Sequence, residues 1–221
     1  MAVKASPPPA SPPPPRRPLR SPRGIAAFVV RADPAFEAVV RVAGPFVPRP
    51  PSADPFNALV RAIVFQQLAG RAATAIHGRF VALFGGDPPT PAAVLTMPVE
   101  ALRGAGLSGA KTAAIIDLAT KGSDGTVPLG ELDDLDDDEV VDRLSVVRGI
   151  GRWTAEMFLL FELGRSDVWP VDDLGVRKGW GMIHGTAMPT PRELAALGEV
   201  LRPHRSAAAW YCWRGAETLT P

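Results

Sequence analysis

The chain has 221 residues, and its 24 basic and 23 acidic side chains leave a net charge of only +1, so no overall basic field indicates a nucleic-acid partner. A single cysteine, Cys212, excludes a disulfide framework, a cysteine-rich zinc site and a four-cysteine iron–sulfur cluster. No apolar run approaches the ~20 residues that a membrane-spanning helix needs, so we expect no membrane partner.

The first 22 residues differ from the rest in composition. They contain nine of the chain's 25 prolines and no acidic or aromatic residue, and with Arg23 they carry five positive charges. Such a segment cannot bury enough apolar surface to offset the entropy lost on ordering. We therefore predict a disordered Pro-rich tail over 1–22 and one folded domain over 23–221. The lone thiol and the Ala-, Pro-, Arg- and Val-rich usage fit the cytoplasm of a bacterium.

Helix start signals recur along the chain, whereas alternating apolar and polar runs of strand length do not. A capping side chain stands before a proline, which is favoured in the first turn of a helix, at Asp33-Pro34, Asp54-Pro55, Thr90-Pro91 and Thr190-Pro191. Helical periodicity follows Asp54 to about Gln67 and recurs over 71–84, 91–97, 110–121, 139–147, 152–163, 174–183, 191–201 and 206–217. We predict an all-α fold of about ten helices with short connections.

An acidic run lies in the middle of the chain, where seven of the nine residues of 131–139 are Asp or Glu. We interpret it as a solvated loop that leads into a helix, because acidic residues favour a helix N-terminus. The central glycine and terminal glutamate of a calcium-binding loop are missing, so we predict no metal site here.

The segment VVRGIGRWTAEMFLLF, at 146–161, is the most informative part of the sequence. Gly149 and Gly151 let the backbone turn sharply between two helices and expose consecutive amide N–H groups, which can bind one phosphate together with the next helix N-terminus. Ile150 should point inward, and Arg152 and Thr154 can add phosphate contacts. The segment therefore predicts a helix-hairpin-helix motif that binds a nucleic-acid backbone without reading its sequence. An ordinary turn between helices is the alternative.

Two adjacent aspartates, Asp172 and Asp173, follow Pro-Val and precede an apolar helix. Neighbouring residues point in different directions, so one carboxylate can cap the helix while the other enters a cleft. The residues alone do not decide between this arrangement and two solvated caps.

Five segments occur in the order and spacing of one protein family: IVFQQLAG (63–70), AGLSGAKTAAIIDLA (105–119), GIGRWTAE (149–156), PVDD (170–173) and RSAAAWYCW (205–213). Over about 36–213 the chain resembles the AlkA-type DNA-3-methyladenine glycosylases II of the helix-hairpin-helix/Gly-Pro-Asp superfamily. The resemblance implies two helical lobes around a DNA-binding cleft, one from the middle of the chain and one from both ends. Only one helix and a loop should fit between Gly24 and Ser52, where longer relatives have a further β-domain.

The resemblance also implies an activity. Such enzymes flip alkylated bases, for example 3-methyladenine or 7-methylguanine, out of double-stranded DNA and hydrolyse the N-glycosidic bond in base excision repair. The family pattern assigns catalysis to Asp173 and leaves Asp172 as the helix cap and fallback. Strand-cleaving relatives have a lysine where this chain has Trp153, so we expect a monofunctional enzyme that uses water as the nucleophile.

The remaining site residues also follow from the resemblance. The base pocket is expected from Trp153, Met157 and Trp213, and the wedge that fills the gap left by the flipped base from Gln67, with Leu68 as the other candidate. We expect a monomer associated with the bacterial nucleoid and no cofactor, with at most a monovalent cation at the hairpin. A non-catalytic helix-hairpin-helix module that only binds DNA is the competing interpretation, and the order of preference among damaged bases stays open.

Overall fold

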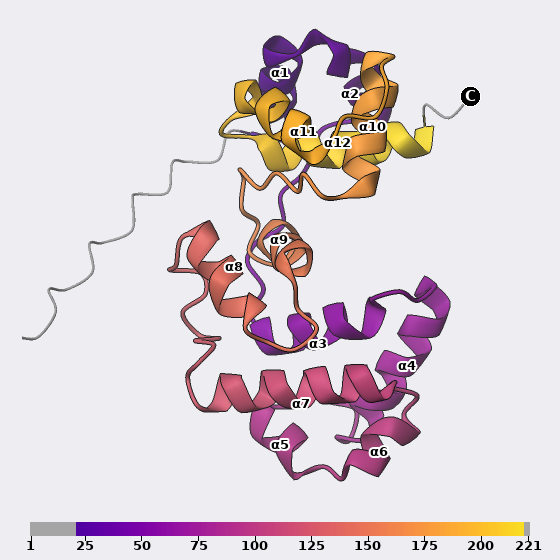
Figure 1. Cartoon of the computed structure of the whole chain (residues 1–221), viewed down its shortest axis with the longest axis vertical. Coiled ribbons are helices and arrows are strands. Elements are labelled where there is room, and N and C mark those ends of the chain that lie inside the picture. The colour runs from indigo at the N-terminus through magenta and orange to yellow at the C-terminus, as the bar shows by residue number, and fades with distance from the viewer. Residues whose placement is uncertain (1–20, 219–221) are drawn as a thin grey trace, which may run out of the picture.

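The computed structural model describes residues 21–218, and every regular element in this range is a helix (Figure 1). The predicted all-α fold is confirmed. Residues 1–20 of the predicted tail lie outside the described residues. The last two residues assigned to the tail are ordered with the first helix: Pro22 begins this helix, and Ser21 caps it by accepting a hydrogen bond on Oγ from Gly24 N at 3.2 Å.

The helices form two lobes that lie one above the other, with α9 near their junction (Figure 1). The hairpin lobe comes from the middle of the chain and contains α3 (Pro55–Phe65), α4 (Gly70–Ala82), α5 (Pro91–Thr96), α6 (Val99–Gly104), α7 (Gly109–Ser123), α8 (Asp137–Ser145) and α9 (Arg152–Phe161). The terminal lobe contains α1 (Pro22–Ala32), the 3-10 turn η1 (Pro34–Phe36), α2 (Glu37–Ala43), α10 (Leu174–His184), α11 (Pro191–Leu197), the 3-10 turn η2 (Gly198–Leu201) and α12 (Arg205–Thr218). This is the lobe arrangement that the family resemblance implies.

The four predicted proline-associated caps are all present. Asp33, Asp54, Thr90 and Thr190 each accept a hydrogen bond from a backbone N–H in the first turn that follows them. The prediction of a single helix between Gly24 and Ser52 is wrong, since α1, η1 and α2 all lie there. Asp33 explains the difference, because it ends α1 with its own backbone and starts the next turn with its side chain. The six-residue α6 was not predicted.

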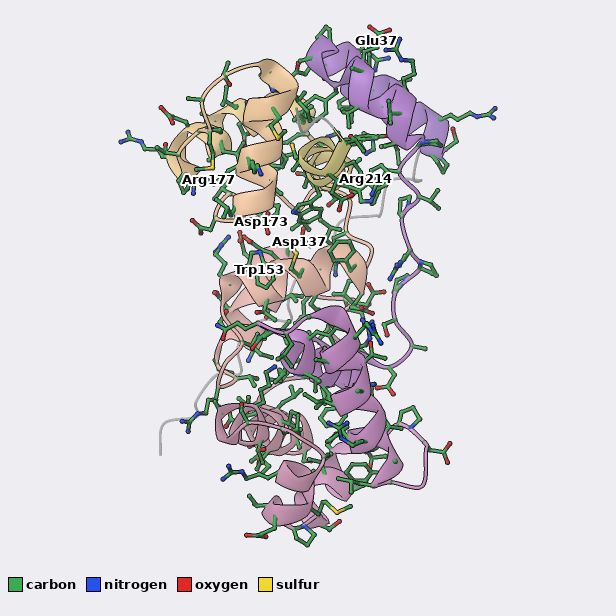
Figure 2. All side chains as sticks on the ribbon, turned by 90° about the vertical axis from the view of Figure 1, so that its right-hand side faces the viewer. Glu37, Asp137, Trp153, Asp173, Arg177 and Arg214 are labelled. Carbon is green, nitrogen blue, oxygen red and sulfur yellow. The ribbon has the colours of Figure 1, made fainter. Side chains whose placement is uncertain are left out.

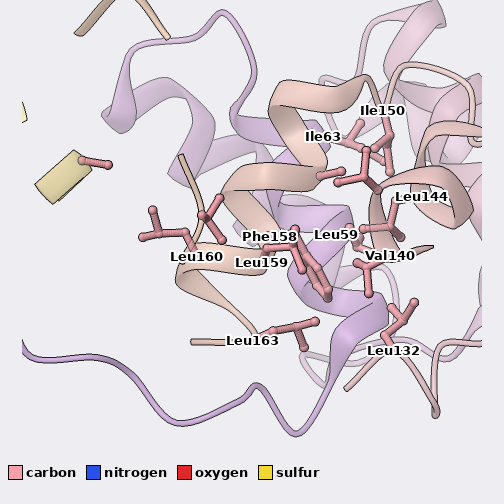
Figure 3. Packing of buried hydrophobic residues seen from close by; sticks show 14 of the residues in the cluster. Leu59, Ile63, Leu132, Val140, Leu144, Ile150, Phe158, Leu159, Leu160 and Leu163 are labelled. Atoms are coloured by element: carbon pink, nitrogen blue, oxygen red, sulfur yellow. The ribbon is translucent and has the colours of Figure 1, made fainter. Parts of the chain in front are cut away.

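The core of the hairpin lobe surrounds the hairpin itself. Figure 3 shows Leu59 and Ile63 of α3 packed beside Leu144 of α8 and Phe158 of α9. Ile150, between the two hairpin glycines, is 3% exposed and joins this cluster, which confirms that it points inward. The apolar contact holds the hairpin in place and leaves its flanking glycines at the surface.

The chain crosses between the lobes twice, at 44–54 and at 162–173, and the two crossings lie side by side. Ser52 N donates to Glu162 O at 2.6 Å. Gly164 has a φ of +63°, and a Cβ atom there would collide with the carbonyl oxygen of Arg49. Tyr211 of α12 fastens the first crossing, because its hydroxyl donates to Gly44 O and accepts from Phe46 N, both at 3.1 Å.

The acidic run supports the second crossing. Arg165 donates to the carbonyls of Asp133 at 2.9 Å and Leu135 at 2.8 Å, so the loop before α8 encloses its guanidinium group. Asp136 caps α8 by accepting from Glu139 N at 2.8 Å, as expected for acidic residues that lead into a helix. Among residues 21–218, no cluster of His, Cys, Asp and Glu is arranged to hold a metal ion, and no helix is long and apolar enough to cross a membrane.

Candidate active site

A cavity of about 750 Å³ opens where the two lobes meet. Its walls come from the C-terminal end of α3, from the hairpin with α9, and from two residues of the terminal lobe. The lining residues are Ala62, Phe65, Gln66, Gln67, Gly149, Trp153, Thr154, Met157, Phe161, Asp173 and Trp213. The cavity therefore brings together the predicted carboxylate and all three predicted pocket residues. In Figure 2, Trp153 and Asp173 lie at the same junction between the lobes.

One face of α9 forms an apolar wall of the cavity. Trp153, Met157 and Phe161 follow each other at intervals of four residues, so their side chains lie along the same side of the helix. The Phe161 ring stacks on Trp213 with a centroid distance of 5.6 Å and an interplanar angle of 26°. Trp153 is 45% exposed, which is unusual for so large an apolar side chain and leaves ring surface available to a ligand.

The carboxylate of Asp173 accepts hydrogen bonds from three donors. Its Oδ1 atom accepts from Val176 N and from Trp213 Nε1, both at 2.8 Å, and its Oδ2 atom accepts from Trp153 Nε1 at 2.8 Å. Asp173 as a whole residue is 9% exposed, so water has little access to its carboxylate. The three donors fix the plane of the carboxylate at the cavity wall.

The prediction that Asp172 caps the following helix is wrong. Asp173, the residue assigned to catalysis, is also the N-cap of α10, whereas Asp172 is exposed and does not cap that helix. Asp173 can serve both purposes because Oδ1 faces the first turn of α10 while Oδ2 faces Trp153 on α9. The backbone bond from Asp173 N to Pro170 O, at 3.0 Å, turns the chain into this position.

Small residues on α10 bring Trp213 to the carboxylate. A Cβ atom on Gly179 would collide with the carbonyl oxygen of Cys212, and one on Gly175 would lie 2.7 Å from Cδ1 of Trp213. Only glycine at these two positions, four residues apart, lets α12 approach α10 so closely. The indole N–H of Trp213 thereby reaches Asp173 Oδ1.

The hairpin has the backbone that the sequence predicts. Gly149 has a φ of +77°, Ile150 N donates to Val147 O at 3.0 Å, and Gly151 is the N-cap of α9, which has no side-chain capping bond. Both glycines are exposed, so their amide groups can be reached from solvent. Arg152 is also exposed, and it lies between Glu156 at 3.1 Å and Asp138 at 3.7 Å.

The predicted phosphate contact of Thr154 does not agree with its position. Thr154 is 6% exposed, and its hydroxyl accepts a hydrogen bond from Gln66 Nε2 at 3.3 Å. The first turn of α9 directs this hydroxyl to Gln66 at the C-terminal end of α3 and leaves little of the residue exposed.

The two wedge candidates lie in the turn between α3 and α4 at the rim of the cavity. Gln67 has a φ of +54°, and it is the only non-glycine residue with a positive φ within 21–218. Leu68 is 39% exposed. Backbone strain of this kind concentrates at functional sites. The preceding residue, Gln66, was not predicted to take part, and no signal in the sequence distinguishes it from its neighbour.

Two buried or half-buried charges flank the site. Burial raises the pKa of Glu156, and the Arg152 guanidinium opposes this effect. Glu156 lies on the face of α9 that turns away from the cavity lined by Trp153. Burial lowers the pKa of Lys111, whose ammonium group donates to Val64 O at 2.7 Å and Gln66 O at 2.8 Å at the C-terminal end of α3.

The chain is similar to known DNA repair proteins in both sequence and structure. Residues 60–203 match the model of the HhH-GPD superfamily base excision DNA repair proteins. DNA-3-methyladenine glycosylase 1 of Schizosaccharomyces pombe is 38% identical over 164 residues, which cover 73% of this chain and 72% of that protein. The structure of the S. pombe 3-methyladenine DNA glycosylase in complex with abasic DNA superposes with a TM-score of 0.77 at 34% identity, over 86% of this chain and 95% of the other. A DNA-3-methyladenine glycosidase of Bacillus halodurans gives a TM-score of 0.79 at 34% identity, over 88% and 89% of the two chains.

Proposed function

Since the chain belongs to the HhH-GPD superfamily of base excision DNA repair proteins, we propose that it is a monofunctional glycosylase that releases alkylated bases, such as 3-methyladenine and 7-methylguanine, from double-stranded DNA. The observation that carries the proposal is the carboxylate of Asp173, fixed by three donors at the wall of a cavity with aromatic sides. Several of its relatives are DNA-3-methyladenine glycosylases.

The cavity suits a flipped, positively charged base. Its volume of about 750 Å³ exceeds what a purine occupies, and Trp153 and Trp213 offer indole rings. A cationic base is attracted to the face of an indole ring by the ring quadrupole. Apolar side chains such as Met157 and Phe161 complete the wall and keep water away from the base.

Asp173 supplies the charge that the reaction needs. As the N-glycosidic bond breaks, its electron pair leaves with the alkylated base and positive charge develops on the sugar ring. A carboxylate held in advance beside that ring stabilises the transition state more than the ground state. Water then adds to C1′ of the sugar and gives up a proton, for which Asp173 Oδ2 is a suitable acceptor.

The identity of the cavity residues supports hydrolysis by water. Strand cleavage through a covalent imine requires an amine next to the sugar. None of the residues that line the cavity is a lysine. Lys111 is directed to the carbonyl groups of α3, and Lys178 is exposed on α10. The product should therefore be an unbroken abasic strand.

A purely DNA-binding module would have the same hairpin but no use for this cavity. Such a protein needs exposed backbone amides at Gly149 and Gly151, and these are present. It does not need a carboxylate that is withdrawn from solvent and held by indole donors from two lobes. Asp173 in its aromatic surroundings therefore favours the enzyme.

Base release from defined duplexes tests the proposal. The full chain is incubated with duplexes that each hold one 3-methyladenine analogue or one 7-methylguanine, and the strands are separated with and without alkali and after borohydride treatment. We expect strand breaks only after alkali and no trapped adduct. Strand breaks before alkali, or a borohydride-trapped complex, would show a strand-cleaving enzyme. Absence of base release with every duplex would favour the non-catalytic module.

A further inference from the structure

The turn that follows α3 is held from two sides by one residue, Gln66. We call residues 66–69 the wedge turn, because they include both wedge candidates. Gln66 Nε2 donates to the carbonyl oxygen of Gly149 at 3.1 Å and to Thr154 Oγ1 at 3.3 Å, so its side chain reaches the hairpin. Its own carbonyl accepts from Lys111 Nζ on α7 at 2.8 Å.

The next residue shows why this anchoring matters. Gln67 has a φ of +54°, a conformation that L-residues with a Cβ atom avoid unless the surrounding structure imposes it. The two side-chain bonds of Gln66 connect the wedge turn to residues that are 83 and 88 positions away in the sequence. They provide a direct polar link between this turn and the motif expected to bind the DNA backbone.

We propose that Gln66 is a positioning residue that couples backbone binding at the hairpin to insertion of the wedge into the duplex. This inference rests on the proposed function. When the hairpin binds a phosphate, the hydrogen bond from Gln66 to Gly149 O fixes the distance between the hairpin and the wedge turn. This distance sets the position at which Gln67 and Leu68 enter the base stack. An error of about 1 Å in such an alignment can reduce a rate by as much as ~100-fold. Gln66 thus acts through the wedge and not through the reacting atoms.

The test follows wedge insertion directly. A duplex with a tetrahydrofuran abasic analogue and a neighbouring 2-aminopurine fluoresces more strongly when stacking at the site is disrupted. The full chain is compared with Gln66→Met, which keeps the side-chain length and loses both donated bonds. We expect the rate of the fluorescence increase to fall on the order of ten-fold, while Kd for an undamaged duplex changes less than about three-fold.

Thr154 gives a matched pair of variants. Thr154→Val removes the hydroxyl acceptor and keeps the shape, so it should slow insertion in the same direction as Gln66→Met but less. Thr154→Ser keeps the acceptor and should restore the wild-type rate. If Gln66→Met fails to fold, as judged by circular dichroism, this pair carries the test alone.

A double-mutant cycle separates positioning from general destabilisation. In a background without the wedge, Gln67→Ala with Leu68→Ala, the change Gln66→Met should have no further effect on excision or on the fluorescence signal. Additive losses would overturn the proposal, as would an unchanged insertion rate in Gln66→Met or equal weakening of undamaged-duplex binding. The abasic analogue has no base to release, so a failure of the proposed glycosylase activity would be recognised separately, in the base-release assay.

Discussion

The indole nitrogen of Trp153 lies 2.8 Å from Oδ2 of Asp173 and donates a hydrogen bond to it. Trp153 is thereby both a wall of the cavity and a support for the carboxylate on which the proposed reaction depends. One helix, α9, begins at the hairpin that would hold the DNA backbone and carries this indole one residue later. The proposed binding of the DNA backbone and the alignment of the Asp173 carboxylate thus both depend on α9.

Asp173→Asn should abolish most base release without unfolding the protein. The amide keeps one oxygen to accept from Val176 N and Trp213 Nε1, and Asn caps helices about as well as Asp. Its NH2 group would face Trp153 Nε1, which is also a donor, so the free energy of unfolding should fall by ~1–3 kcal/mol. Loss of the negative charge should slow release by about 10²–10³-fold or more, because the charge acts in the transition state. Binding to an abasic-site analogue should stay within about three-fold.

The control for this variant is Asp173→Ala, which also removes the cap and should cost about 1 kcal/mol of stability beyond Asp173→Asn. Full activity of Asp173→Asn together with a loss in Asp172→Asn would move the catalytic assignment to the neighbouring residue.

Trp153→Phe should reduce the rate constant of release more than the affinity for DNA. The phenyl ring keeps an aromatic face for the base but removes the hydrogen bond to Asp173. A hydrogen bond to a charged group contributes ~1.5–3 kcal/mol, so we expect a loss on the order of ten-fold or more in single-turnover rate. Combined with Asp173→Asn, the change should add little.

Trp169→Phe is the matched control. Trp169 also donates an indole hydrogen bond, to Leu194 O at 2.8 Å, but lies outside the cavity. It should lower stability and leave the single-turnover rate unchanged. Equal rate losses in both variants would argue against a specific role for Trp153.

Gly179→Ala should destabilise the terminal lobe. A Cβ atom there would collide with the carbonyl oxygen of Cys212, and overpacking of this kind costs ~1–3 kcal/mol or more. Since the same contact brings Trp213 to Asp173, activity should fall as well. Gly78→Ala is the control, because Gly78 is an exposed residue inside α4 with open space around it. That change should stabilise by ~0.5–1 kcal/mol. Urea unfolding measures both, and equal effects would contradict the packing argument.

Glu156→Gln should alter how stability depends on pH. Burial raises the pKa of Glu156 in the folded protein above the ordinary value of a glutamate. Between those two values the folded state binds a proton that the unfolded state has released. The unfolding free energy of the wild type should therefore rise relative to that of Glu156→Gln as the pH falls through this range. Urea titrations at pH 7 and near pH 5 test the sign. A difference that is constant, or that shrinks on acidification, would contradict it.

The sequence predicted most of the fold because helix starts are local. Asp54 before Pro55 and Thr190 before Pro191 specify their caps within four residues, and both are present. Contacts between distant segments could not be predicted in this way. Whether Asp172 or Asp173 caps α10 depends on how the chain turns at Pro170. The periodicity of apolar residues does not predict the direction of this turn.

The resemblance to a family placed Asp173, Trp153, Met157 and Trp213 in the site, and all four line the cavity. Trp153 and Met157 are separated by one helical turn, and the same interval continues to Phe161, which helical periodicity could have added. Gln66 and Thr154 are different, because their roles come from a hydrogen bond across 88 residues. Gln66 could not be told apart from its neighbour Gln67 by residue type. For Thr154, its place next to the hairpin suggested a phosphate as its partner, whereas its hydroxyl accepts from Gln66.

The bond between Tyr211 and the first crossing has a consequence for biosynthesis. Tyr211 bonds to Gly44 and Phe46 from 167 and 165 residues further along the chain, so the terminal lobe cannot be completed until α12 has left the ribosome. The hairpin lobe, built from residues between α3 and α9, can form earlier. A nascent chain can therefore form the hairpin proposed to bind the DNA backbone first, and the aromatic pocket around Asp173 is completed last, when Trp213 has been synthesised.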